Sequence, residues 1–73
     1  MEPINMLEQH LNLFPAKFCW QGRVYQIDSV TECKTITNPL GRSEAYHFWV
    51  RCEGKSMHLS QMLASGQWVL QQD

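Results

Sequence analysis

Apolar residues over positions 1–14 recur with the spacing of a helix. The residues that carry this pattern are Ile4, Leu7, Leu11 and Phe14. Pro3 suits the first turn of a helix, and Pro15 disfavours helical backbone at the residue before it. We therefore predict a short N-terminal helix over 1–14. Because so short a helix is marginal in water, its apolar stripe is expected to pack against the rest of the domain or against a partner.

From position 16 onward the apolar residues alternate with polar ones, which is the pattern of a strand. Phe18 and Trp20 fall on one face of the first such segment. Gln21 and Gly22 then predict a tight turn into a second strand over 23–27. These residues are expected to form a β-hairpin.

The alternation is interrupted between Ile27 and Val30, which predicts a bulge or bend near 28–29 before the strand continues through Cys33. A bend at this point would curl the sheet. The polar stretch 38–43 contains an Asn-Pro pair and a glycine, and it predicts the loop that separates the two halves of the chain.

The second half carries the strongest strand signal of the chain, over 45–53. The apolar members of its alternation are Tyr46, Phe48, Val50 and Cys52. A turn at 53–55 leads into a strand that contains Met57 and Leu59, and a last short strand is expected at 68–70. Residues 61–64 fit either a loop or a single helical turn.

These patterns predict an α+β domain that is mainly β. The helix over 1–14 is followed, over 16–71, by a curled five-stranded antiparallel meander, either an SH3-like small barrel or a half-open sheet. A chain of 73 residues has room for one core, so a single domain over 1–73 is expected.

Charge and cysteine content narrow the classes of function. The formal net charge of −1 provides no overall attraction to nucleic acid or to an anionic membrane. The stretch 17–55 holds six basic and four acidic residues, a mild excess of +2. The sequence has three cysteines without a CxxC pair and shows no apolar leader, which favours a cytoplasmic protein. It has no run of about 20 apolar residues, so we expect that it does not cross a membrane.

Candidate metal ligands are present but poorly spaced. They are His10, Cys19, Cys33, His47, Cys52 and His58. Structural zinc usually takes its ligands from close pairs, and the nearest two, His47 and Cys52, fall on opposite faces of one strand. No phosphate-binding loop, HExxH or GxSxG motif occurs. We therefore expect neither metal nor other cofactor, and no enzymatic activity.

Trp49 is the most informative single residue. It alternates with Phe48, so if Phe48 belongs to the core then Trp49 faces outward together with His47 and Arg51. An exposed Trp beside basic residues is typical of a stacking surface for unpaired bases or of the centre of a protein interface. The alternative is that the helix over 1–14 covers this face and buries Trp49.

Several aromatic and glycine-containing segments form a recognisable series: Phe18-Cys19-Trp20-Gln21-Gly22-Arg23-Val24-Tyr25-Gln26-Ile27-Asp28-Ser29-Val30, then Tyr46-His47-Phe48-Trp49-Val50-Arg51, Gly54, Leu59 and Ser65-Gly66-Gln67-Trp68-Val69-Leu70. Together they resemble a family of small uncharacterised bacterial β-domains that carry F-x-W-x-G-R-x-Y-x-V, then W-R-V, then G-x-W-x-L. Similar segments occur near the C-terminal end of polymerase-like proteins of mutagenic DNA repair. The resemblance covers about 16–70 and implies the fold and a role near nucleic-acid-processing machinery. A charged Tyr-Arg-Asp element of the family is replaced here by Ser60-Gln61-Met62, so its charged site does not carry over.

The leading functional hypothesis is a small non-enzymatic interaction module. It would act as an accessory subunit that binds a protein partner or self-associates, through one sheet face and the loop at Met62 and Leu63. Its motivation is a surplus of large apolar side chains over what a small sheet can bury. These side chains are Trp49, Met57, Met62, Leu63 and Trp68.

The alternative hypothesis is direct binding of single-stranded nucleic acid. Trp49 would be the stacking surface, with basic residues around it. The residues expected at this surface are His47, Trp49, Arg51, Arg23, Arg42 and Lys55.

Overall fold

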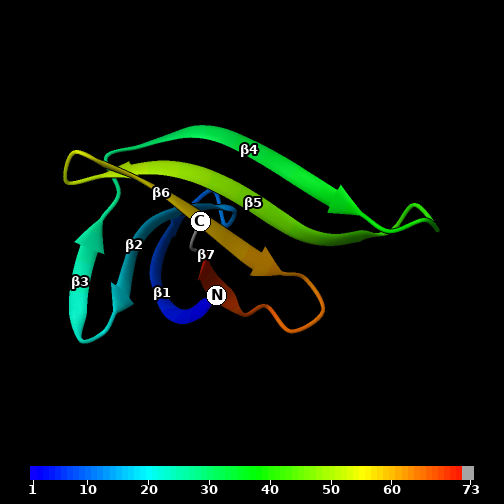
Figure 1. Ribbon diagram of the computed structural model, residues 1–73, viewed down its shortest axis with the longest axis horizontal. Coiled ribbons are helices and arrows are strands. Elements are labelled where there is room, and N and C mark those ends of the chain that lie inside the picture. Colours follow the sequence, from blue (N-terminus) through cyan, green and yellow to red (C-terminus); the bar gives the residue numbers. More distant parts are fainter. Residues whose placement is uncertain (72–73) are drawn as a thin grey trace.

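The computed structural model describes residues 1–71, which form one antiparallel sheet curled into a half-barrel (Figure 1). The strands of this part of the chain are β1 (Glu2–His10), β2 (Phe14–Trp20), β3 (Arg23–Gln26), β4 (Ser29–Thr37), β5 (Ser43–Cys52), β6 (Lys55–Met62) and β7 (Trp68–Gln71). Their order across the sheet is β3-β2-β1-β7-β6-β5-β4. The mainly β prediction is confirmed, with the half-open arrangement. Positions 72–73 of the predicted domain lie outside the described residues.

The predicted N-terminal helix is wrong: the described residues contain seven strands and no helix, in place of one helix and five strands. Residues 2–10 form β1, which pairs with β2 on one side and β7 on the other. Of the supposed helical stripe, Ile4 is buried, whereas Leu7 and Leu11 are 44% and 88% exposed.

The physical reason lies in a pairing that the local sequence does not display. Ile4 and Met6 alternate inward, and irregular register between Met6 and Gln9 then breaks the period of two, so the apolar spacing imitates a helix. A helix of this length is marginal by itself, whereas β1 gains hydrogen-bonded neighbours on both sides.

Tight turns connect the strands within each half of the sheet. At Gln21 and Gly22 the φ angles are 51° and 76°, as the two-residue turn predicted there requires. Glu53 and Gly54 repeat this geometry with φ angles of 53° and 77° between β5 and β6. Both predicted turns are confirmed. A third turn, at 11–12, was concealed by the helical spacing.

The interruption predicted near 28–29 is a change of strand rather than a bend in one strand. The N–H of Ile27 donates to the Ala16 carbonyl (2.9 Å), and the N–H of Asp28 donates to the Arg51 carbonyl (2.8 Å). Two consecutive residues thus attach the chain to β2 and then to β5, which lie far apart in the strand order. This short connection draws the two ends of the sheet toward each other and produces the curl. A bulge does occur slightly later, at Thr31.

The core occupies the concave side of the curled sheet. Its buried cluster consists of Ile4, Phe18, Phe48, Val50, Leu59, Trp68 and Leu70. The ring of Trp68 stacks on that of Phe48, with centroids 5.4 Å apart. Trp68 is therefore a core residue, and Met57 also packs against the core, so the apolar surplus is smaller than the sequence indicates.

Residues 61–64, left open by the sequence, continue β6 to Met62 and then turn toward β7. Among the described residues, no helix has the length and apolar character needed to cross a bilayer.

Candidate functional site

A ring cluster formed by His47, Trp49 and His58 lies on the side of β5 and β6 opposite the core. Trp49 is paired across the strands with His58, and their rings stack with centroids 4.4 Å apart and planes 14° apart. His47 Nδ1 and His58 Nε2 are 2.7 Å apart, so one imidazole donates a hydrogen bond to the other. The predicted placement of Trp49 and His47 on one strand face agrees with these contacts. His58 is a member that sequence reasoning about one strand did not find.

Lys34 approaches this ring cluster from β4. Its Nζ lies 5.7 Å from the centroid of the Trp49 ring and 3.5 Å from Glu32 Oε1. Because β4 and β6 flank β5, Lys34 and His58 approach the indole from strands on opposite sides of β5. Trp49 is consequently half-buried, although no helix covers it. The alternative in which an N-terminal helix covers Trp49 is wrong, since residues Glu2–His10 form β1.

Arg51 continues the same face of β5 toward the β5–β6 turn. Its guanidinium donates to Ser56 Oγ and to the Gly54 carbonyl, each at 3.3 Å. These contacts tie Arg51 to its own hairpin.

The remaining predicted residues separate into two places. Arg42, Met62 and Leu63 come together in a pocket of about 470 Å³ where the β4–β5 loop meets the end of β6. Asn38, Ser43, Glu44 and Ala64 complete its lining. Met62 and Leu63 are half-buried rather than displayed on a loop. This pocket is mostly apolar, and it brings Arg42 to Met62 and Leu63, a contact that the sequence did not predict.

Arg23 has a different environment. Its Nη2 lies 2.6 and 2.8 Å from the two carboxylate oxygens of Glu53, and its guanidinium carbon lies 4.7 Å from the centre of the Tyr25 ring. The charge of Arg23 is therefore compensated by a carboxylate, and the structure does not place it in the ring cluster.

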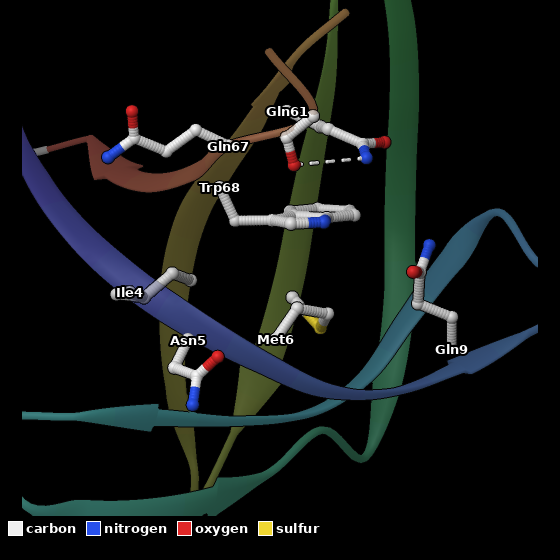
Figure 2. Close-up of a pocket in the computed structure, with 8 residues that line it drawn as sticks. Ile4, Asn5, Met6, Gln9, Gln61, Gln67 and Trp68 are labelled. Carbon is white, nitrogen blue, oxygen red and sulfur yellow. Dashed lines mark hydrogen bonds between the residues drawn. The ribbon is translucent and has the colours of Figure 1, made fainter.

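A second pocket, of about 330 Å³, opens beside Trp68 and has a rim of amide side chains (Figure 2). The amides are Asn5, Gln9, Gln61 and Gln67. Figure 2 shows the indole of Trp68 between Gln61 and Met6, and Gln61 Nε2 donates to the Gly66 carbonyl at 3.4 Å. The sequence reasoning missed this pocket because its members come from β1, β6, the turn before β7 and the first residue of β7. Its lining contains no nucleophile and no acid or base.

The three thiols are free and differ in exposure. Cys33 is exposed, whereas Cys52 is buried and its Sγ lies 3.1 Å from the Gln26 carbonyl. Burial raises the pKa of the Cys52 thiol above its ordinary value, and the nearby carboxylates of Glu53 and Asp28 raise that pKa further. Within residues 1–71, no group of three or more His, Cys, Asp and Glu side chains is placed to hold a metal ion.

The longer of the two edge strands of the described sheet is β4, with nine residues against four in β3. It lies at the end of the strand order, next to β5 alone within the described chain. Figure 1 shows it along the outer side of the molecule. None of its residues is buried. A strand in this position presents N–H and C=O groups that can pair with another strand.

Hydrogen bonds identify which β5 residues face β4. The Trp49 carbonyl accepts from Thr31 Oγ1 at 3.0 Å, and the Arg51 carbonyl accepts from the N–H of Asp28 at 2.8 Å. Since alternate residues of a strand direct their main-chain groups to the same side, His47 also faces β4.

The outward groups of β4 follow from this alternation. Lys34 is the cross-strand partner of His47, so its N–H and C=O face β5. Cys33 and Thr35, one position before and after it, direct theirs to the free edge. These two residues define the strand-binding edge of β4.

Comparison with known proteins found no match: no model of a protein family, no curated protein and no solved structure resembles this chain significantly.

Proposed function

We propose that this chain is a small, non-enzymatic protein-interaction module that binds an extended polypeptide segment as an additional strand along β4. The observation that carries the proposal is the free edge of β4, nine residues long with none of them buried. Strand addition of this kind derives affinity from main-chain hydrogen bonds and specificity from alternate side chains.

The curvature of the sheet supports this mode of binding. A strand added to β4 would extend the half-barrel on the side where it is open, beyond Cys33 and Thr35. Tyr46, the cross-strand partner of Thr35, is a half-buried residue that packs against the core cluster. The added strand would shield this partly covered aromatic side chain, so apolar burial would reinforce the main-chain hydrogen bonds.

The pocket formed by Arg42, Met62 and Leu63 adds a second contact. Asn38, which follows β4 directly, lines this pocket. An incoming segment that runs along β4 and extends past Asn38 would bring its next side chains to an apolar hollow. This arrangement retains the interaction role proposed for Met62 and Leu63.

Direct binding of single-stranded nucleic acid is less well supported. The Trp49 indole already has two neighbours, His58 and Lys34, so a base would have to compete with them for stacking. Basic side chains in ion pairs with carboxylates include Lys17 with Glu8, Arg23 with Glu53, and Lys34 with Glu32.

Features of the sequence favour a cellular location and a role for the proposed module. The free cysteines favour the cytoplasm, and the resemblance of residues 16–70 favours an accessory role beside nucleic-acid-processing machinery.

Two proline variants test strand addition. Thr35→Pro removes an N–H that faces the free edge, whereas Lys34→Pro removes one that faces β5 and is expected to destabilise the fold. Nine-residue peptides selected from a displayed random library on the wild-type protein are the probes. We expect them to bind folded Thr35→Pro at least about tenfold more weakly, since one main-chain hydrogen bond is lost and the added strand is displaced.

Hydrogen exchange measured by NMR supplies the second readout. Bound peptide should slow exchange of the Cys33 and Thr35 amides more than that of Lys34, which is already bonded to β5. Selected peptides that bind wild type and Thr35→Pro equally, or a library that yields no binder, would contradict the proposal.

A further inference from the structure

We infer that the free edge of β4 pairs with β4 of a second copy of this chain, antiparallel and centred on Cys33. This inference rests on the proposed strand addition and specifies its partner. Its basis is that the charge pattern of the edge strand is complementary to itself in one register.

The first constraint is the direction of the main-chain groups. Cys33 and Thr35 face the free edge, so a partner strand must place its own outward residues opposite them. An antiparallel pair related by a twofold axis can then be centred on Cys33, or shifted by one residue to centre on Glu32 or on Lys34.

The second constraint is charge. Glu32 and Lys34 lie on the same face of β4, on either side of Cys33. In the register centred on Cys33, Glu32 lies opposite the partner's Lys34, and by symmetry Lys34 lies opposite the partner's Glu32. Opposite charges directly across an antiparallel pair are favourable.

The two neighbouring registers are disfavoured for the same reason. Centring on Glu32 places two glutamates directly opposite each other, and centring on Lys34 does the same with two lysines. Like charges in this position are destabilising. Among these three registers the charges therefore favour the one centred on Cys33, which pairs each Glu32 with the partner's Lys34.

The extent of the paired segment is limited by the bulge at Thr31. In the selected register Thr31 lies opposite the partner's Thr35, so the bulge interrupts the ladder at that pair and regular pairing is confined to 32–34 in each copy. An interface built on so short a ladder is small, and we expect the dimer to be weak and dependent on concentration.

Charge reversal tests the register directly. In Glu32→Lys or Lys34→Glu alone, like charges face each other at both symmetric positions, and we expect the dissociation constant of the homodimer to rise roughly tenfold to a hundredfold. The double variant Glu32→Lys/Lys34→Glu restores opposite charges and should dimerise like wild type. An equimolar mixture of the two single variants should form heterodimers. Sedimentation equilibrium over a range of concentrations measures all four.

The competing explanation is that the charges on this edge strand prevent association. In that case each single reversal would leave self-association unchanged or increase it, and the double variant would show no rescue. Either result would overturn the selected register.

A wild-type chain that stays monomeric at about 1 mM would overturn the second-copy inference. The strand-addition proposal would survive that result if selected peptides still bound in a manner sensitive to Thr35→Pro. If the wild type stays monomeric and no selected peptide binds in a manner sensitive to Thr35→Pro, both proposals are contradicted. The two experiments therefore distinguish failure of the homodimer from failure of strand addition.

Thiol cross-linking provides an independent check of geometry. In the selected register the Cα atoms of Cys33 and the partner's Cys33 are roughly 5.5 Å apart, within reach of a short bismaleimide. Cys33→Ser should abolish the cross-link. Thr37→Cys in that background should not restore it, because the two thiols would lie about 27 Å apart along the strands. A cross-link at residue 37 but not at residue 33 would contradict the inference.

Discussion

β4 and β5 pair with each other along most of their lengths, yet they occupy opposite extremes of burial. β5 lies between β4 and β6 and buries Ala45, Phe48, Val50 and Cys52, whereas no residue of β4 is buried. Along the side where they meet, both strands belong to the same antiparallel ladder. The difference is that β5 has a second hydrogen-bonded neighbour and a core beneath it, and β4 has neither along its outer edge. Position in the sheet, more than strand propensity, therefore separates a structural strand from one available for binding.

The largest expected effect is loss of the β5 core side chain. Phe48 is fully buried and contacts the rings of Phe14, Tyr46 and Trp68, so Phe48→Ala should lower the free energy of unfolding by about 3–5 kcal/mol. Urea denaturation followed by Trp fluorescence measures this loss.

The matched control is on β4. Ile36→Ala should cost less than about 1 kcal/mol, because that side chain is 42% exposed. If Phe48→Ala leaves no cooperative transition, Phe48→Leu supplies a readable core variant that should still lose more stability than Ile36→Ala. Equal losses at the two strands would break the contrast between them.

Cysteine reactivity sharpens the same comparison. Cys33 on β4 is exposed and should react with a small maleimide at least about tenfold faster than Cys52 on β5, which is buried with a raised pKa. Mass spectrometry of the native protein over time resolves the two sites. Comparable rates under native conditions would show that β5 opens as readily as β4.

The raised pKa of Cys52 also predicts a direction for stability against pH. The folded chain holds the thiol proton more tightly than the unfolded chain, whose thiol titrates near the ordinary value of 9.0. This contribution is fully present below that pH and is lost as the pH rises above it. Cys52→Ala should remove that part of the alkaline decline in unfolding free energy, and Cys33→Ala should leave it in place.

The smallest effect concerns the surface ion pair that joins β3 to the β5–β6 turn. Arg23 and Glu53 are about half-exposed, so a double-mutant cycle with Arg23→Ala and Glu53→Ala should give a coupling below about 1 kcal/mol that weakens with salt. Thermal unfolding at low and high salt provides the cycle. A larger, salt-insensitive coupling would mean that the opposite edge of the sheet depends on this pair as strongly as β5 depends on its core.

Much of the fold was predictable because its signals are local. Alternation over 45–53 identified β5, and the glycines at 22 and 54 identified two turns, since left-handed backbone is required there. The prediction of a helix in the N-terminal segment was wrong for a specific reason. Irregular register in β1 gave Leu7 and Leu11 a helical spacing although both are exposed.

The candidate sites were likewise predictable only where the signal is local. Alternation alone placed Trp49 and His47 on one face of a strand and Phe48 on the other. Nothing local indicated that His58 would stack on Trp49, or that Arg42 would meet Met62 and Leu63, because these contacts depend on which strands become neighbours.

The sequence by itself determined a β-rich chain, its period of two, most of its turns and the side of β5 on which each residue lies, because these depend on residues close together in the chain. Only the tertiary structure decided that β1 joins β7 and that β4 is left at an open edge. The reason is that segments far apart in the chain compete for main-chain hydrogen bonds and for burial of apolar side chains when strands pair. The outcome of this competition depends on the whole chain at once.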